Sequence, residues 1–153
     1  MQPRIERNDA RESDAQASQQ PFTLPVRVYY EDTDAGGVVY YANYLKFCER
    51  ARTEWLRTLG VSQQRALIDE QGLGFVVRSV QADYRAPARL DDALEVITQV
   101  AMLRRASILF EQQLVRGQEL LFTARVLLAS IDLRRQKPVA IPASLHALLE
   151  SKA

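Results

Sequence analysis

Three carboxylates and two glycines lie together near the start of the chain, between a strand-like segment and a helical one. They form the run Glu31-Asp-Thr-Asp-Ala-Gly-Gly37. Glycine allows a ligand to approach the backbone closely, and the first turn of a helix offers free N–H groups and the positive end of its dipole. These groups would stabilise the oxyanion that forms in acyl transfer. Asp34, beside the acyl carbonyl, would attack it or activate a water molecule.

Structural roles compete for the same aspartates. Asp34 would cap the helix and Asp32 would order the turn, because Asp side chains accept hydrogen bonds from nearby backbone N–H groups. Composition and spacing alone favour these roles over a catalytic one. The residues by themselves leave Asp34 open between capping and acyl chemistry.

A second candidate site is the run Arg104-Arg-Ala-Ser107, at the turn between two expected strands. Arginine binds phosphate through its planar fork of donors, so Arg104 and Arg105 are candidates to hold a nucleotide, with Ser107 beside them. The alternative is a solvated hairpin tip. Without further information, the hairpin tip is the better explanation.

The single cysteine and the single histidine exclude several other chemistries. One cysteine, Cys48, cannot form an intrachain disulfide, and its apolar helical surroundings predict a buried, inert thiol. A Ser-His-Asp triad or a zinc site would have to use His146, near the C-terminus, without a second histidine. We expect His146 to be a surface or partly buried helix residue, and we expect no metal or redox cofactor.

The elements around the acidic run follow from periodicity. Phe22–Tyr30 is rich in β-branched and aromatic residues and predicts a strand, and Pro21 and Pro25 suit a strand start or an edge strand better than a central one. Apolar residues at helical spacing predict a long helix from Asn43 to Leu59, stopped by Gly60. A short helix over Gln63–Gln71 is expected next, capped by Ser62.

The remainder of the chain is dominated by strand patterns with short connections, which favours antiparallel hairpins. The expected strands are Phe75–Tyr84, Ala93–Leu103, Ala106–Arg116 and Leu120–Ile131, followed by a short final helix. One long helix must bury its apolar face against a sheet, so the class is α+β. The simplest arrangement is an antiparallel sheet wrapped around one central helix, the hotdog fold. We expect a single domain over residues 21–150 and a disordered tail over residues 1–20.

Charge and hydropathy exclude further classes of function. Twenty basic and nineteen acidic residues give a formal charge of +1, so no broad attraction to nucleic acid or anionic membrane is expected. No apolar run approaches the roughly 18 to 20 residues that span a bilayer, and the first twenty residues lack the apolar core of a signal peptide. A cytoplasmic location is expected.

Several blocks of the sequence together resemble a known family. They are Val26 to Tyr40 (VRVYYEDTDAGGVVY), Glu49-Arg-Ala-Arg-Thr-Glu54, Phe75-Val-Val-Arg78 and Tyr84-Arg-Ala-Pro-Ala-Arg-Leu-Asp-Asp92. The acidic run resembles the signature of the 4-hydroxybenzoyl-CoA thioesterase group of hotdog proteins. The chain as a whole resembles the Tol–Pal-associated acyl-CoA thioesterases of that superfamily, from about Pro25 to Pro142.

The resemblance implies roles for individual residues. The family's catalytic aspartate falls on Asp34, and the backbone N–H that polarises the thioester carbonyl falls on Tyr41. Many Tol–Pal-associated members have histidine at this second place, and we expect the backbone N–H to be what matters. A basic cluster that contacts the phosphates of coenzyme A falls on Arg104 and Arg105, with Ser107 as a weaker candidate. A different hotdog arrangement uses a glutamate inside the central helix, and Glu49, about two turns past Tyr41, lies within reach of such a role; an accessory or salt-bridging role is expected for it here.

The function implied by the resemblance is hydrolysis of an acyl-CoA thioester to a free acid and coenzyme A, which is part of the substrate and not a cofactor. Related proteins build their sites across a subunit interface, so a homodimer or a homotetramer is expected. The rival hypothesis is a non-catalytic protein that binds acyl carrier protein or envelope-biogenesis factors. A link to the Tol–Pal system is implied by the resemblance alone.

Overall fold

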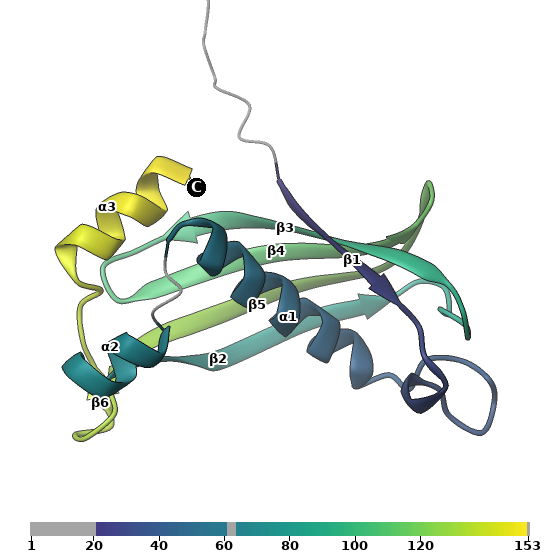
Figure 1. The fold of residues 1–153 in the computed structure, drawn as a ribbon, viewed down its shortest axis with the longest axis horizontal. Coiled ribbons are helices and arrows are strands. Elements are labelled where there is room, and N and C mark those ends of the chain that lie inside the picture. The colour runs from purple at the N-terminus through teal and green to yellow at the C-terminus, as the bar shows by residue number, and fades with distance from the viewer. Residues whose placement is uncertain (1–20, 61–63, 153) are drawn as a thin grey trace, which may run out of the picture.

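One long helix crosses the inner face of a curled antiparallel sheet (Figure 1). The structure is a computed structural model that describes residues 21–60 and 64–152, with backbone alone for residues 64–67. The strands are β1 (Phe22–Arg27), β2 (Leu73–Tyr84), β3 (Ala93–Leu103), β4 (Ser107–Arg116), β5 (Glu119–Asp132) and β6 (Lys137–Pro138). The helices are the 3-10 turn η1 (Tyr30–Asp32) and the α-helices α1 (Asn43–Thr58), α2 (Gln64–Gln71) and α3 (Ala143–Lys152).

The sheet has the strand order β1-β3-β4-β5-β2, with the short β6 beside β5. All pairings are antiparallel, including Phe22 opposite Thr98 and Leu73 opposite Asp132. The two edges differ. β1 is short and contains Pro25, which suits an edge because proline donates no ladder hydrogen bond, whereas β2 is twelve residues long and contains no proline. The predicted α+β hotdog architecture is confirmed.

Burial explains why these segments fold as they do. Alternate residues of β4 are buried, as expected for a strand with one face on a core. The predicted stripe of α1 faces the same core, which includes Tyr44, Phe47, Cys48, Ala51, Trp55 and Leu56 from the helix and Ile108, Phe110, Leu114, Phe122 and Val126 from the sheet. Burial of the two apolar faces against each other is what fixes the helix on the sheet.

The first strand is shorter than predicted, and the reason is local. The chain leaves β1 after Arg27 and turns at η1, where the Tyr29 N–H donates to Asp32 Oδ2 (2.8 Å) and the Asp32 N–H donates to the Tyr29 carbonyl (3.0 Å). This reciprocal pair replaces the ladder bonds that further strand residues would have made. The other expected elements agree with the structure to within two residues at each end described.

Two predictions at helix ends can be compared with the structure. Gly60 has a φ of +83°, the left-handed conformation expected after a helix C-terminus. The expected cap at Ser62 and the tail over residues 1–20 lie outside the described residues. In the part of the chain that the structure describes, no helix has the length and apolar character needed to cross a membrane.

Candidate active site

The acidic run folds as a miniature hairpin between β1 and α1. Thr33 and Val39 form an antiparallel bridge, the Asp34 N–H donates to the Val38 carbonyl (2.9 Å), and the Gly37 N–H donates to the Asp34 carbonyl (3.0 Å). Gly37 has a φ of +77°, which favours glycine at this position. The reversal places Asp34 at the tip of the loop, on the approach to α1.

The Asp34 side chain does not cap the helix, so the capping hypothesis is wrong. Its Oδ1 accepts a hydrogen bond from the Gly36 N–H (2.8 Å), while the N-cap of α1 is Ala42, which makes no side-chain capping bond. A Cβ on Gly36 would lie 3.1 Å from Asp34 Oδ1, so glycine lets the carboxylate sit this close to the backbone. Asp34 is exposed, and its Oδ2 accepts no hydrogen bond from the described residues.

Asp32 orders the turn, as expected. The residue is buried, and its carboxylate accepts the Tyr29 N–H. Its carbonyl accepts both the Tyr40 N–H and the Asn43 side-chain amide, each at 2.9 Å. Because Asn43 is the first residue of α1, Asp32 ties the loop to the start of the helix.

A second segment, residues 85–92, fastens the loop from outside. The Val39 N–H donates to the Ala88 carbonyl (2.8 Å), and Val38 bridges to Arg89. Ala88 is in turn held to α1, because its N–H donates to the hydroxyl of Tyr44 (3.0 Å). The Asp34 loop therefore rests on a second loop that is itself anchored to the helix.

The 85–92 segment is held by a charged cluster around Asp92. The Asp92 carboxylate accepts the Arg89 N–H (2.8 Å) and pairs with the Arg116 guanidinium (2.6 Å), which also pairs with Glu119 (2.7 Å). Partial burial alone would raise the pKa of the Asp92 carboxyl, but these hydrogen bonds and the Arg116 charge together lower it. The ionised form of Asp92 is the one that the fold stabilises.

The start of α1 presents free donors, as the oxyanion hypothesis requires. Within the described residues, the backbone N–H groups of Tyr41 and Ala42 donate to no acceptor. The Tyr41 carbonyl accepts the hydroxyl of Tyr84 (2.7 Å), at the end of β2. The Tyr84 ring packs on Tyr44 and Phe122, with centroids 5.2 and 4.9 Å away. Tyr84 thus holds the backbone of Tyr41 in place.

Sequence reasoning did not single out Tyr84. It lies 43 positions after Tyr41 and at the end of a strand pattern, where aromatic residues are ordinary. The only signal was that a block shared with the resembling family begins at this residue. Its role depends on β2 and α1 meeting in space.

The predicted nucleotide residues lie at the other end of the sheet from Asp34. β3 begins at Ala93, opposite Arg27 at the end of β1, and runs away from the Asp34 loop to Leu103. Ten steps of about 3.3 Å put the Arg104 turn roughly 33 Å along the strand. One chain therefore does not bring Asp34 and the arginine pair together.

The turn that carries Arg104 and Arg105 borders two separate hollows. Arg104 and Ser107 line a hollow on the outer face of the sheet, next to Arg125, with Arg104 Nε 3.0 Å from Met102 Sδ. Arg105 and Arg104 border a second hollow beside α3 that includes His146. Both arginines are exposed, and His146 is partly buried as expected. The turn is closed by the Arg104 N–H donating to the Ser107 carbonyl (2.9 Å).

Comparison with known proteins places the chain in a family. Residues 28–149 match the Thioesterase-like superfamily, which covers most of the sequence. The chain belongs to the thioesterase-like superfamily.

Individual relatives of this thioesterase-like protein agree with that assignment. It is 56% identical to a protein of Haemophilus influenzae named acyl-CoA thioesterase YbgC, over 82% of this chain and 92% of the relative. It is 37% identical to a protein of the same name from Helicobacter pylori, over 82% of this chain and 97% of that protein. The crystal structure of a probable thioesterase from Bartonella henselae superposes with a TM-score of 0.75 at 38% identity, covering 80% of this chain and 99% of the other. The predicted enzyme class, a thioester hydrolase, is confirmed at the level of the family.

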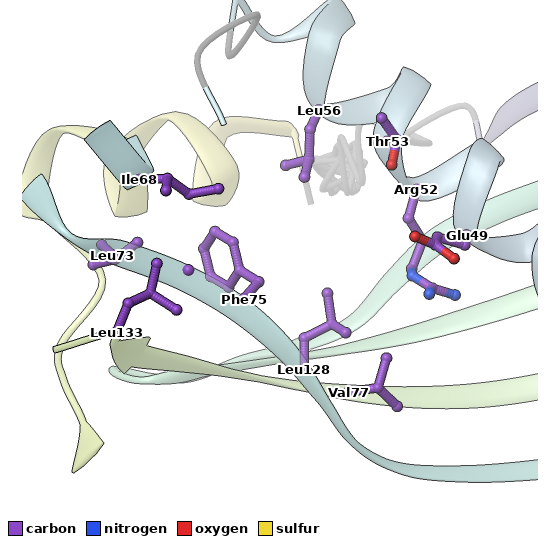
Figure 2. Close-up of a pocket in the computed structure, with 11 residues that line it drawn as sticks. Glu49, Arg52, Thr53, Leu56, Ile68, Leu73, Phe75, Val77, Leu128 and Leu133 are labelled. Atoms are coloured by element: carbon purple, nitrogen blue, oxygen red, sulfur yellow. The ribbon is translucent and has the colours of Figure 1, made fainter. Parts of the chain in front are cut away.

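A cavity of about 310 Å³ lies under the C-terminal half of α1, against α2 and the first part of β2 (Figure 2). One wall is polar and the rest is mostly apolar. The polar residues are Glu49, Arg52 and Thr53; the others are Leu56, Ile68, Leu73, Gly74, Phe75, Val77, Leu128 and Leu133. None of the lining residues comes from the Asp34 loop. Glu49, exposed and six residues into α1 from Asn43, stands about 9 Å along the helix from its start.

The single cysteine and the lack of a metal-ligand cluster narrow the chemistry of this thioesterase-like protein. Cys48 is buried, as predicted. Burial raises the pKa of its thiol to about 12, with nearby Arg52 opposing the shift, which favours the unreactive thiol form expected from the sequence. Within residues 21–60 and 64–152, no group of three or more His, Cys, Asp or Glu side chains could hold a metal ion. The absence of a cofactor requirement stays a prediction.

Proposed function

We propose that the protein hydrolyses acyl-CoA thioesters to a carboxylic acid and coenzyme A, with Asp34 as the reacting side chain. The observation that carries this proposal is the placement of Asp34. Its carboxylate is fixed by Gly36, keeps Oδ2 free, and lies on the loop that leads into the uncapped start of α1. Family membership and the names of the relatives support the same chemistry.

Two routes use this arrangement. In one, an Asp34 oxygen attacks the thioester carbon, the thiolate of coenzyme A leaves, and water then hydrolyses the resulting anhydride. In the other, Asp34 removes a proton from water as the water attacks, and the protonated Asp34 then gives this proton to the sulfur of coenzyme A as it leaves. In both, the N–H of Tyr41 and the positive end of the α1 dipole would stabilise the oxyanion.

A complete site is proposed to need two subunits, for a geometric reason. β2 is a long edge strand with exposed Val76, Val77, Val80 and Tyr84, and an uncovered edge of this kind invites pairing with a second chain. In an antiparallel pairing of β2 with its copy, the Tyr84 end of one chain meets the Leu73 end of the other. Leu73 pairs with Asp132 and Ser107 with Ala129, so the Arg104 turn and the cavity lie toward the Leu73 end. Asp34 of one subunit would then face the arginine turn and the cavity of its partner.

Mixing two disabled variants tests this arrangement. Asp34→Asn and the double variant Arg104→Glu with Arg105→Glu are each expected to be nearly inactive at low acyl-CoA concentration. Random mixing makes half of the dimers mixed, and each mixed dimer has one undamaged site if Asp34 works with the partner's arginines. Activity should then recover to about a quarter of the parent value. No recovery in confirmed mixed dimers would show that each site uses residues of one chain.

The arginine pair should act on binding and not on the chemical step. A guanidinium–phosphate contact is held alike in ground and transition states, so Arg104→Ala with Arg105→Ala should raise KM by about tenfold or more and leave kcat nearly unchanged. A thioester with only a pantetheine-like arm lacks these phosphates and should be hydrolysed equally by both proteins. Equal damage on both substrates would exclude the phosphate role and favour a role in folding or in the subunit interface.

The non-catalytic alternative is tested by steady-state release of coenzyme A from a panel of acyl-CoAs. A folded protein that releases no thiol from any of them would be a binding protein, with acyl carrier protein or an envelope-biogenesis factor as its partner. The link to the Tol–Pal system and the cytoplasmic location are proposed from the family resemblance. Co-purification with Tol–Pal components and cell fractionation would test them.

A further inference from the structure

The cavity under α1 has a buried arginine in its wall that forms no ion pair with the described residues. Arg52 is only 7% exposed. In the described part of the chain, none of the ion pairs includes it. Glu49, one turn earlier on α1, is exposed and does not pair with it. Figure 2 shows Arg52 and Glu49 together on one side of the cavity, with the apolar side chains of Leu73 and Leu133 on the other.

Arg52 is hydrogen-bonded to a neutral side chain, that of Gln112, which is itself held by two further hydrogen bonds. Arg52 Nη1 donates to Gln112 Oε1 (2.9 Å), and Gln112 Nε2 donates to the Cys48 carbonyl and to Thr98 Oγ1, each at 2.9 Å. All of these groups are buried beneath α1. The network therefore fixes the guanidinium, but it satisfies only one of its nitrogen atoms.

The remaining donors of Arg52 face accessible space. Among the described side chains that are not exposed, Ser130 Oγ is the sole polar atom with neither a hydrogen-bond partner nor contact with solvent. Within the described residues, Arg52 Nε and Nη2 have no hydrogen-bond partner, yet neither is among the atoms sealed from solvent. Because Arg52 lines the cavity, the cavity is the accessible space next to these donors. Burial lowers the pKa of Arg52, and the nearby Cys48 and Glu49 oppose this shift only in part.

We propose that the cavity receives acyl groups that carry an oxygen acceptor in addition to the thioester carbonyl, and that Arg52 binds this oxygen. A hydroxyl, a keto group or a second carboxylate would accept the free guanidinium donors. The hydrocarbon part of the acyl group would lie against Leu56, Phe75 and Leu128. A plain hydrocarbon chain would cover Arg52 and leave its donors without water or a partner, which is costly.

This inference rests on the proposed function, and the parent enzyme alone can refute it. The substrates are hexanoyl-CoA, 3-hydroxyhexanoyl-CoA and adipoyl-CoA, which have the same number of acyl carbons. We expect kcat/KM to be higher by about tenfold or more for at least one of the two oxygenated substrates, as for a hydrogen bond to a charged group. Equal or faster hydrolysis of hexanoyl-CoA would overturn the inference and leave the proposed function standing. Hydrolysis of none of the three would overturn the inference, and the proposed function would fail with it only if no member of the wider acyl-CoA panel were hydrolysed.

Two variants separate ligand binding from a structural role of Arg52. Arg52→Met should hydrolyse the oxygenated substrates and hexanoyl-CoA at similar rates, whereas Arg52→Lys, which keeps the charge, should retain part of the preference. The matched control is Arg50→Met, because Arg50 is exposed on the same helix and does not line the cavity. A folded Arg52→Met enzyme with an unchanged preference would overturn the inference. If Arg52→Met does not fold, the inference is tested by the substrate preference of the unmodified enzyme and of Arg52→Lys on the same three substrates.

Discussion

At the scale of single residues, the two aspartates of the acidic run, Asp32 and Asp34, differ in their surroundings. Asp32 is buried and uses its oxygens to hold the turn. Asp34, two positions later, is exposed and keeps one oxygen free. The same residue type thus has a structural role at position 32 and is proposed to have a chemical role at position 34, because Asp32 is buried and Asp34 is exposed.

Asp34→Asn keeps the size of the side chain and removes its charge. We expect kcat to fall by about a hundredfold or more with little change in melting temperature, as for a nucleophile or a general base. Asp32→Asn should instead lower the melting temperature, because it weakens a buried hydrogen bond. Glu49→Gln should change kcat much less than Asp34→Asn. A folded Asp34→Asn protein with near-normal turnover would exclude Asp34 as the reacting group.

Tyr84→Phe removes the hydroxyl that holds the Tyr41 carbonyl and leaves the packed ring in place. Because Tyr41 carries the proposed oxyanion donor, we expect kcat to fall by about tenfold, with KM nearly unchanged, as for an interaction that matters most in the transition state. Tyr30→Phe is the matched control, since Tyr30 is exposed and its hydroxyl makes no hydrogen bond in the described structure. A normal kcat for Tyr84→Phe would show that the start of α1 is held without it.

At the scale of elements, the Asp34 loop depends on the 85–92 segment, and that segment depends on the Asp92 cluster. The lowered pKa of Asp92 has a definite consequence for pH dependence. A carboxyl whose pKa is lower in the folded state stabilises the fold above its unfolded pKa, about 3.9. That stabilisation is lost as the pH falls from about 4 through the lower pKa of the folded state.

Asp92→Asn tests this coupling. The variant should lose about 1 to 3 kcal/mol of unfolding free energy at neutral pH, as expected for hydrogen bonds to a charged group. Its melting temperature should then change less than that of the parent between pH 5 and pH 3. The Asp92 carboxyl of the parent begins to lose its stabilising effect in this range, because the pKa of the unfolded state, about 3.9, lies within it. Melting curves at several pH values provide the measurement. Parallel pH profiles for the two proteins would contradict the assignment of the shift to Asp92.

At the scale of the whole molecule, the contrast between the two sheet edges predicts how copies associate. β1 is short and contains a proline, while β2 is long and exposes valines. Lysine on an edge strand opposes pairing because its charge would have to be buried. Val80→Lys should therefore shift the protein from dimer to monomer in analytical ultracentrifugation.

Activity should fall together with dimer content, because the proposed site combines Asp34 of one subunit with the cavity of the other. The matched control is Val139→Lys, since Val139 is also exposed but lies outside β2. A monomeric Val80→Lys enzyme with full activity would refute the two-subunit site. If Val80→Lys leaves a dimer unchanged, the subunit interface does not involve this part of β2.

The sequence by itself determined the elements and the family. The helical spacing over Asn43–Thr58 and the strand patterns after Gly74 depend on which residues face a core, and that information is local. The resemblance of the acidic run pointed to the same superfamily as the comparisons. The glycine at position 60 also marked the helix end correctly, because a left-handed conformation has a recognisable residue preference.

Only the tertiary structure decided which residues meet. It showed that Asp34 bonds to Gly36 and caps no helix, that Tyr84 holds Tyr41, and that the arginine turn lies at the far end of β3. It also placed Arg52, a charged residue, among the buried residues of α1 and in the wall of a cavity. The physical reason is that these relations join residues far apart in the chain or depend on the rotation of a helix against a sheet. Periodicity records which face of an element is buried, but not what lies against that face.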